Sequence, residues 1–439
     1  MSNNSNKLLK NTSYLILVQV ANLLLPFISL PIITRILGVE NFGKINYSIA
    51  LINYFILIID FSFNYSAVRS TVSVVDDRVK VNAIFNRVFT TKIILFVIST
   101  LIFLLGLFLF ADSKSYAISI LAYLFTISTV LNNNWFYQAF QVLSKVALFS
   151  FFNKLLFTVL IIVVIKEKDD YLYYVMIYSL TAIVTSILSF LYILKKYQLK
   201  LQLVSLLKVL EILKKDYTLF LSMVIISLYT TTNIVLLGIR SNAHEVGIFS
   251  SSEKIIILVN TILNISFSQA LYPYISLCFN KNKEHGITTI KKIIPIVLLV
   301  VGSASVIVGL MSKYIVLILF GSEFLAASPL ITLLSIIPII ICLSNILGIQ
   351  VMLNLKMDKQ FLFITIIGAI TGLTSNYFLS NYFGALGTSI SWILAECMIT
   401  SLMIYYLYKN KISLFSLNYF KPNNLKSLFS ILLKGNKNN

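Results

Sequence analysis

Long apolar stretches recur along almost the whole chain and constrain its fold more than any other feature. A helix needs about 20 mostly apolar residues to cross the hydrocarbon layer of a bilayer. We predict about twelve such spans, at residues 14–34, 45–66, 88–111, 116–138, 146–165, 171–194, 217–239, 248–272, 293–312, 328–352, 361–380 and 384–408. Continuous runs favour helices, because a membrane β-barrel shows segments of about 10 alternating residues.

Composition identifies the solvent of these segments. Of 439 residues, 58% are hydrophobic and only 12% are charged, whereas soluble domains carry about 25% charged residues. No soluble core could bury so much apolar surface. The sequence therefore predicts an all-α integral membrane protein. The first span follows a short polar start, and no small-residue cleavage site comes after the span, so we expect the span to be retained. We expect a kink in it at Pro26 and Pro31.

Basic residues are unevenly distributed over the connections between the predicted spans. The formal net charge is +19, from 35 Lys and Arg against 16 Asp and Glu. A basic protein often binds nucleic acid, but here the basic residues concentrate in alternate connections. The richer connections are expected to face the cytoplasm, together with both termini. We therefore expect no nucleic-acid partner.

The longest basic connection is the linker "KKYQLKLQLVSLLKVLEILKKD" at residues 195–216. Its leucines recur at helical spacing, which indicates an amphipathic helix on the inner membrane surface. The linker separates two halves of six predicted spans. The expected divisions are an N-terminal lobe 1–194, the linker 195–216, a C-terminal lobe 217–408 and a basic cytoplasmic tail 409–439.

The two halves share a short internal sequence similarity. "RILGVENFG" (35–43) follows the first span and "RSNAHEVG" (240–247) follows the seventh. Both run from an arginine through an acidic residue to a glycine. Repeats of this parallel kind occur in transporters.

Several chemistries are not expected from the residues present. Cys278, Cys342 and Cys397 lie far apart without a C-x-x-C pair, and His244 and His285 fall on opposite predicted sides. We therefore expect no metal site and no disulfide framework. The chain has no phosphate-binding G-x-x-x-x-G-K-[ST] loop and no G-x-S-x-G motif. These absences favour a transporter over an enzyme, without a cofactor.

Two carboxylates fall inside predicted spans, where an ionisable group costs about 2.5–3.5 kcal/mol at mid-helix. Asp60 lies about two turns from the cytoplasmic end of its span, where it could pair with a cation such as Lys92. Glu396 lies near the middle of the last span and has no cation nearby in sequence. We expect it to have a role in coupling, since a buried carboxylate can take up a proton or a cation.

Cations outnumber carboxylates in and beside the spans. Lys92 and Lys154 lie a turn or two inside their spans and could also reach the surface. Glu253 and Lys254 are adjacent, so their side chains diverge by about 100° on a helix. Two arginines end their spans at the outer interface, where anchoring is the alternative role: Arg35 and Arg240. This balance suits the transport of an anionic solute. A gradient of the solute itself, or of H⁺ or Na⁺, would drive that transport.

Several segments carry a resemblance to a known family. "LPIITRILGVENFGKINYSIALINYF" (30–55) and "IIDFSFNYSAVRS" (58–70) resemble the polysaccharide-exporter branch of the MATE-like MOP flippase superfamily. That branch contains the Wzx-type O-antigen and capsular repeat-unit flippases. Further similar blocks lie at 246–255, 268–276, 319–328 and 383–396.

The resemblance implies two six-helix lobes in an inverted V with alternating access. It implies transfer of an undecaprenyl-diphosphate-linked oligosaccharide from the cytoplasmic to the outer leaflet of the bacterial plasma membrane. Membrane lipids and polysaccharide polymerase components are the other expected partners. The expected diphosphate and glycan cavity contains Arg35, Arg69, Lys92, Lys154, Arg240 and Lys254. The expected coupling or charge-organising residues are Asp60, Glu253 and Glu396.

Three alternatives stay open at this point. A MATE-type cation-coupled drug or metabolite antiporter should have a site dominated by carboxylates. A lipid II flippase commonly has two helices more than the twelve predicted here. A membrane scaffold without transport should tolerate neutral residues at Asp60 and Glu396.

Overall fold

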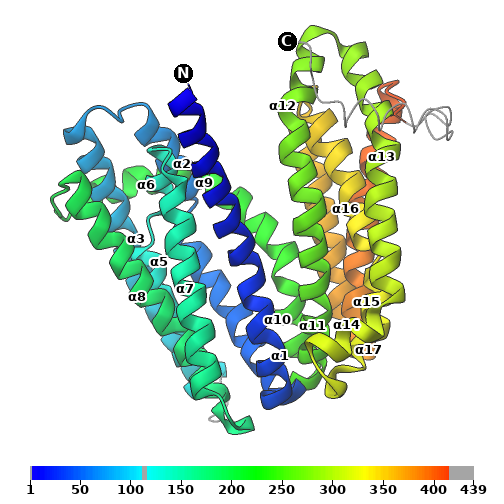
Figure 1. Cartoon of the computed structure of the whole chain (residues 1–439), viewed down its shortest axis with the longest axis horizontal. Helices are drawn as coiled ribbons and strands as arrows, with labels where there is room; N and C mark the ends of the chain where they lie inside the picture. The colour runs from blue at the N-terminus through cyan, green and yellow to red at the C-terminus, as the bar shows by residue number, and fades with distance from the viewer. Residues whose placement is uncertain (1, 111–115, 415–439) are drawn as a thin grey trace. The chain divides into compact units, whose positions relative to one another are not determined.

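The computed structural model describes residues 2–110 and 116–414, and every element within them is a helix (Figure 1). Nine helices of these described ranges are long and apolar enough to cross a membrane. The predicted all-α membrane fold is thus confirmed. The predicted tail 409–439 lies outside the described residues from position 415 onward.

Two of the long helices each run from one predicted span into the next. α1 (Ser2–Asp60) leaves helical geometry at Gly38 (φ 73°, ψ 176°), and α17 (Asp358–Lys409) does so at Gly384 (φ 53°, ψ −130°). Both φ values are positive, which glycine adopts without steric cost. A glycine therefore joins the two spans directly in each case, without a loop.

The chain divides into two compact units, of which the first comprises Met1–Ser227 and Leu319–Gly321. Besides α1, its helices are α2 (Phe63–Val72), α3 (Arg78–Phe110), α4 (Tyr116–Tyr123), α5 (Phe125–Leu131), α6 (Asn134–Ala139), α7 (Leu143–Val164), α8 (Tyr171–Tyr197) and α9 (Leu206–Thr230). α1 packs against α7, and α8 packs against α5 and α7 (Figure 1). A short 3₁₀ turn, η2 (Lys168–Asp170), precedes α8.

The segment expected as an amphipathic linker packs with this first unit. α8 ends at Tyr197, and α9 begins only at Leu206. Between them the chain hydrogen-bonds to side chains of α3: the Lys200 N–H donates to Asn82 Oδ1 at 2.9 Å, and the Val204 N–H donates to Thr90 Oγ1 at 3.2 Å. These bonds replace helical ones, so the helix covers only the second half of 195–216.

The second unit comprises Leu228–Ile318 and Ser322–Asn439. Two π-helical turns lie within its apolar segments, η3 (Thr261–Ile265) and η5 (Ile346–Met352). Buried aliphatic residues of α13, η5 and α17 form its core, for example Val301, Leu347 and Ile399. Its other helices are α10 (Thr232–Arg240), α11 (Ala243–Asn260), α12 (Ser266–Lys281), α13 (Lys283–Leu310), α14 (Ser312–Leu319), η4 (Ser322–Phe324), α15 (Ala327–Leu334) and α16 (Ile337–Asn345).

Candidate functional site: a buried ion pair at two helix breaks

Asp60 stands where the second membrane segment is interrupted. It is the last residue of α1, and α2 starts at Phe63. The two residues between the helices, Phe61 (φ 40°) and Ser62 (φ 63°), adopt left-handed conformations, which are uncommon for residues other than glycine. The break ends the helix at the carboxylate.

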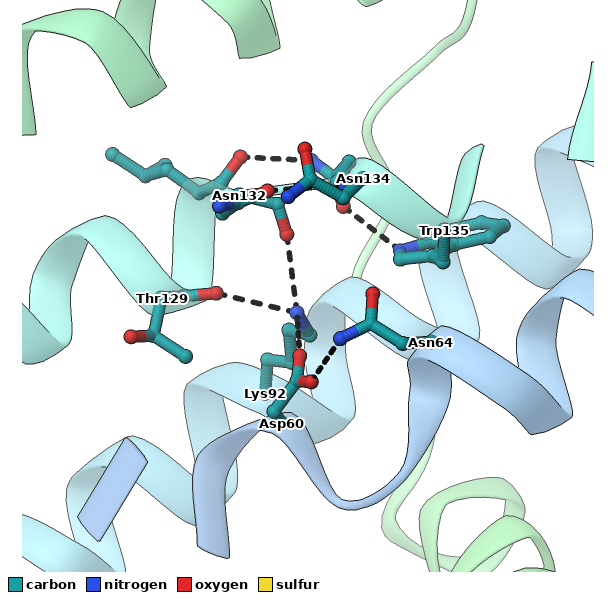
Figure 2. A network of polar contacts seen from close by, with 9 residues as sticks. Asp60, Asn64, Lys92, Thr129, Asn132, Asn134 and Trp135 are labelled. Carbon is teal, nitrogen blue, oxygen red and sulfur yellow. Dashed lines mark hydrogen bonds and ion pairs between the residues drawn. The ribbon is translucent and has the colours of Figure 1, made fainter. Parts of the chain in front are cut away.

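Lys92 of α3 forms the ion pair that was expected for Asp60. Lys92 Nζ lies 2.8 Å from Asp60 Oδ1, and the lysine side chain is only 1% exposed while that of Asp60 is 23% exposed (Figure 2). Burial without a partner would be very costly for either charge. The pairing explains how an ionised lysine is accommodated within a membrane-spanning helix.

The other two protons of Lys92 bind a second helix break. Its Nζ donates to the carbonyls of Thr129 at 3.2 Å and Asn132 at 3.1 Å (Figure 2). These carbonyls lie at the C-terminal end of α5, where Asn132 turns to an extended backbone (ψ 121°). The last carbonyls of a helix lack intrahelical donors and carry partial negative charge, so a cation there stabilises the end.

Lys92 thus uses all three of its ammonium protons within the protein. In this arrangement it offers no proton to a ligand. Its expected place in an anion cavity stays a prediction, which would require the network to rearrange.

Asparagines complete the network on both sides of the ion pair. Asn64 donates from Nδ2 to Asp60 Oδ2. Beyond α5, the Asn133 Oδ1 accepts from the Trp135 indole N–H at 3.1 Å, and the Asn134 N–H donates to Asn132 Oδ1 at 3.0 Å (Figure 2). Lys92 therefore connects the break between α1 and α2 with the break between α5 and α6.

An aromatic core surrounds these breaks and keeps the local dielectric low. Phe63, Phe85 and Trp135 are fully buried beside the network. The Phe61 ring stacks on Phe220 of α9, with ring centroids 4.4 Å apart. Electrostatic attraction is stronger in such surroundings than in water.

The other expected site residues of the first unit lie apart from this network. Lys154 Nζ donates to the Asn22 carbonyl of α1 at 2.6 Å. The Arg35 stem lies over Gly321, so that a Cβ at Gly321 would stand 3.0 Å from Arg35 Cγ. Arg69 is exposed on α2 and lines a cavity.

In the second unit the two expected carboxylates are buried on different helices. Glu396 is 7% exposed in the second half of α17, one turn after its hydrogen-bond partner Trp392. Glu253 is 9% exposed on α11, next to the partly buried Lys254. Arg240 lies over the Tyr377 ring, with Cζ 4.4 Å from the centroid, a favourable cation–π contact.

Sequence reasoning missed several polar residues that the structure brings together. Asn64, Thr129 and Asn132 bind the ion pair, and the "NNNW" run at 132–135 was a visible signal of a break inside an apolar segment. In the second unit Asn376 Nδ2 donates to Asn233 Oδ1 at 3.1 Å. Within the described residues no group of three or more His, Cys, Asp or Glu could hold a metal.

Known proteins match the chain in sequence over nearly its whole length. The family model described as "Polysaccharide biosynthesis protein" matches residues 8–279. A "Putative O-antigen transporter" of Escherichia coli (strain K12) is 31% identical over 94% of this chain and 99% of its own. A second protein of the same description, from Shigella dysenteriae, is 25% identical over 90% of this chain and 98% of its own.

Solved structures show the same fold at low sequence identity. The "Lipid II flippase MurJ, inward closed conformation" superposes with a TM-score of 0.73, at 13% identity, covering 97% of this chain and 94% of that one. An inward-facing multidrug resistance MATE family transporter of the MOP superfamily gives 0.67 at 13% identity, with 94% and 96% covered. The resemblance seen in the sequence blocks is confirmed: this multi-pass membrane protein belongs to the polysaccharide biosynthesis protein family.

Proposed function

We propose that the protein is a flippase for lipid-linked oligosaccharides. Its substrate would be an undecaprenyl-diphosphate-linked repeat unit of O-antigen or capsular type, moved from the cytoplasmic to the outer leaflet by alternating access. The observation that carries the proposal is the full-length match to relatives described as O-antigen transporters. The MurJ- and MATE-like fold supports it, because both neighbours are named as a flippase or a transporter.

The charge balance of the chain suits this substrate. A diphosphate is anionic and is held best by arginine and lysine, while a glycan needs a hydrated surface. The proposed contacts are those predicted from the sequence, with Arg69, Lys154 and Arg240 as the first to test. The Asp60–Lys92 pair holds two helix breaks together, so its proposed role is to organise the first unit.

Coupling to H⁺ or Na⁺ is the proposed source of energy, with Glu396 as the group that exchanges charge. Its support is burial: a carboxylate buried in an apolar segment is costly when ionised. The proposed location is the bacterial plasma membrane, with both termini in the cytoplasm and the polymerase of the same glycan as a neighbour.

Complementation tests the proposal. The gene is expressed in a bacterial strain that lacks a repeat-unit flippase, and surface glycan is measured against protein level in the membrane. We expect surface glycan to return. The same cells are assayed for efflux of cationic dyes, so that restored efflux without glycan would identify the antiporter alternative and refute the flippase.

A further inference from the structure

A cavity of about 610 Å³ lies in the first unit, and its lining includes no residue of the ion-pair network. It is lined by α2, the start of α3 and the first turns of α9, and it is open to the surroundings on one side. Its size falls within the range of about 300–1,000 Å³ that is typical of small-ligand sites. It is therefore large enough for a phosphate-bearing headgroup.

Cations dominate the lining of this cavity. Arg69 comes from α2, Arg87 from α3, and Lys208 and Lys215 from α9; the carboxylates Glu211 and Asp216 oppose them. Four cations against two carboxylates leave a formal balance of +2. Two consecutive helices, α2 and α3, and the distant helix α9 thus bring basic residues to one space.

These four cationic side chains are uncommitted, unlike Lys92. Among the residues that the structure describes, none of the four enters an ion pair, and none donates a side-chain hydrogen bond. The guanidinium groups of the two arginines and the ammonium groups of the two lysines are therefore available to bind an anion. Arginine binds phosphate oxygens through paired, charge-assisted hydrogen bonds.

A buried hydroxyl in the same lining also lacks a partner. Ser66 of α2 is 2% exposed and lines the cavity, and its Oγ makes no hydrogen bond within the described chain. A buried polar atom without a partner is unusual. A phosphate oxygen in the cavity would supply the acceptor that Ser66 lacks.

The surroundings of the cavity indicate that the phosphate belongs to a lipid. α9 packs Val209 into the core, while Leu206, Leu207 (73% exposed) and Leu210 project from another face of the same turns. An exposed row of leucines beside basic residues is typical of a segment that lies on a membrane surface. Basic residues next to a membrane helix attract anionic lipid headgroups.

We propose that this cavity binds the phosphate headgroup of a lipid at the membrane surface. Arg69 and Arg87 bind the phosphate oxygens, and the Ser66 hydroxyl donates a hydrogen bond to one of them. Lys208 and Lys215 supply further positive charge. The lipid is either an anionic phospholipid or a polyprenyl diphosphate, since both present the same chemistry. The site does not depend on the proposed transport, because binding requires no movement across the bilayer.

Binding is measured by native mass spectrometry of the purified protein in neutral detergent. Three probes are titrated: phosphatidylglycerol, undecaprenyl diphosphate and the zwitterionic phosphatidylcholine. We expect at least one of the two anionic lipids to bind more tightly than phosphatidylcholine, and the preferred one identifies the source. Arg69→Ala/Arg87→Ala should weaken that binding about tenfold or more, because charge-assisted bonds to both arginines are lost.

A matched control separates the cavity from general surface charge. Lys208→Ala/Lys215→Ala removes two cations of the cavity from exposed positions of α9, so we expect the variant to fold like the native protein. Lys195→Ala/Lys214→Ala removes the same charge from exposed positions that do not line the cavity. Weaker binding in the cavity pair alone supports the proposal. Equal effects in both pairs, or no preference for either anionic lipid in the native protein, would overturn it.

Discussion

Removing the cation of the buried pair should destabilise the first unit strongly. In Lys92→Met the side chain is unbranched and one atom shorter. Among the described residues Asp60 then retains only Asn64 as a partner, and two carbonyls at the end of α5 lose their donor. Breaking a buried ion pair costs about 3–5 kcal/mol, and Asp60 is partly exposed. We expect a loss of about 4 kcal/mol in the free energy of unfolding, with the carbonyls contributing.

Removing the anion should cost less. In Asp60→Asn the lysine keeps both carbonyl acceptors and can still donate to the amide oxygen, so we expect a loss of about 3 kcal/mol. The double variant leaves no unpaired charge. The loss of unfolding free energy in the double variant should be about 2 kcal/mol smaller than the sum of the losses in the two single variants. This difference is the coupling energy between the two contacting residues.

Unfolding free energies are measured by SDS titration in mixed micelles, with the membrane level in cells as a second readout. The control is the exposed pair Lys44–Glu40, which has the same 2.8 Å separation but side chains that are 40% and 66% exposed. Its coupling should stay below about 1 kcal/mol. Strict additivity at Asp60 and Lys92, or a loss below about 1 kcal/mol for Lys92→Met, would refute the reasoning.

Three further predictions concern other parts of the chain. Glu396→Gln should lower surface glycan in complemented cells while protein level is unchanged, because the amide keeps the size and removes the titration; normal glycan would exclude a coupling role. Gly384→Ala should lower the free energy of unfolding by about 2 kcal/mol, since positive φ strains alanine and its Cβ would lie 2.5 Å from Glu245 Oε2. The control Gly106→Ala meets no atom within 4 Å and should be stabilising by about 0.5–1 kcal/mol; a loss there as large as at Gly384 would exclude the steric explanation. A cysteine at Ser205 should resist an impermeant thiol reagent in intact cells and react after permeabilisation; labelling of intact cells would invert the proposed topology.

The membrane fold was predictable because apolar length is a local property of the sequence. The paired charges were also accessible, since Asp60 and Lys92 each need a partner within an apolar segment. The hydrogen bonds from Lys92 to the end of α5 were not predictable from the sequence, because they depend on where α5 ends. Only the structure shows that the Asn132 carbonyl is turned toward Lys92.

The basic cavity could not be predicted for a different reason. Arg69 and Arg87 lie in one predicted connection and Lys208 and Lys215 in another, and only the tertiary fold brings them to one cavity. The sequence predicts a helix across the whole linker 195–216, because its leucines from Leu203 onward have helical spacing, but the chain between Tyr197 and Leu206 is not helical. Side chains of α3 bind its backbone instead, a tertiary interaction that local periodicity does not report.

Transport by the purified protein tests the proposed function most directly. Proteoliposomes are loaded with an undecaprenyl-diphosphate-linked oligosaccharide that carries a fluorescent label on the glycan, and a membrane-impermeant quencher is added outside. With this protein present, the fluorescence protected in the inner leaflet should fall with time toward complete quenching, and it should stay at about half in protein-free vesicles. A protected fraction equal to that of protein-free vesicles, with native folded protein inserted and an ion gradient imposed, would contradict the assignment of this chain as a flippase.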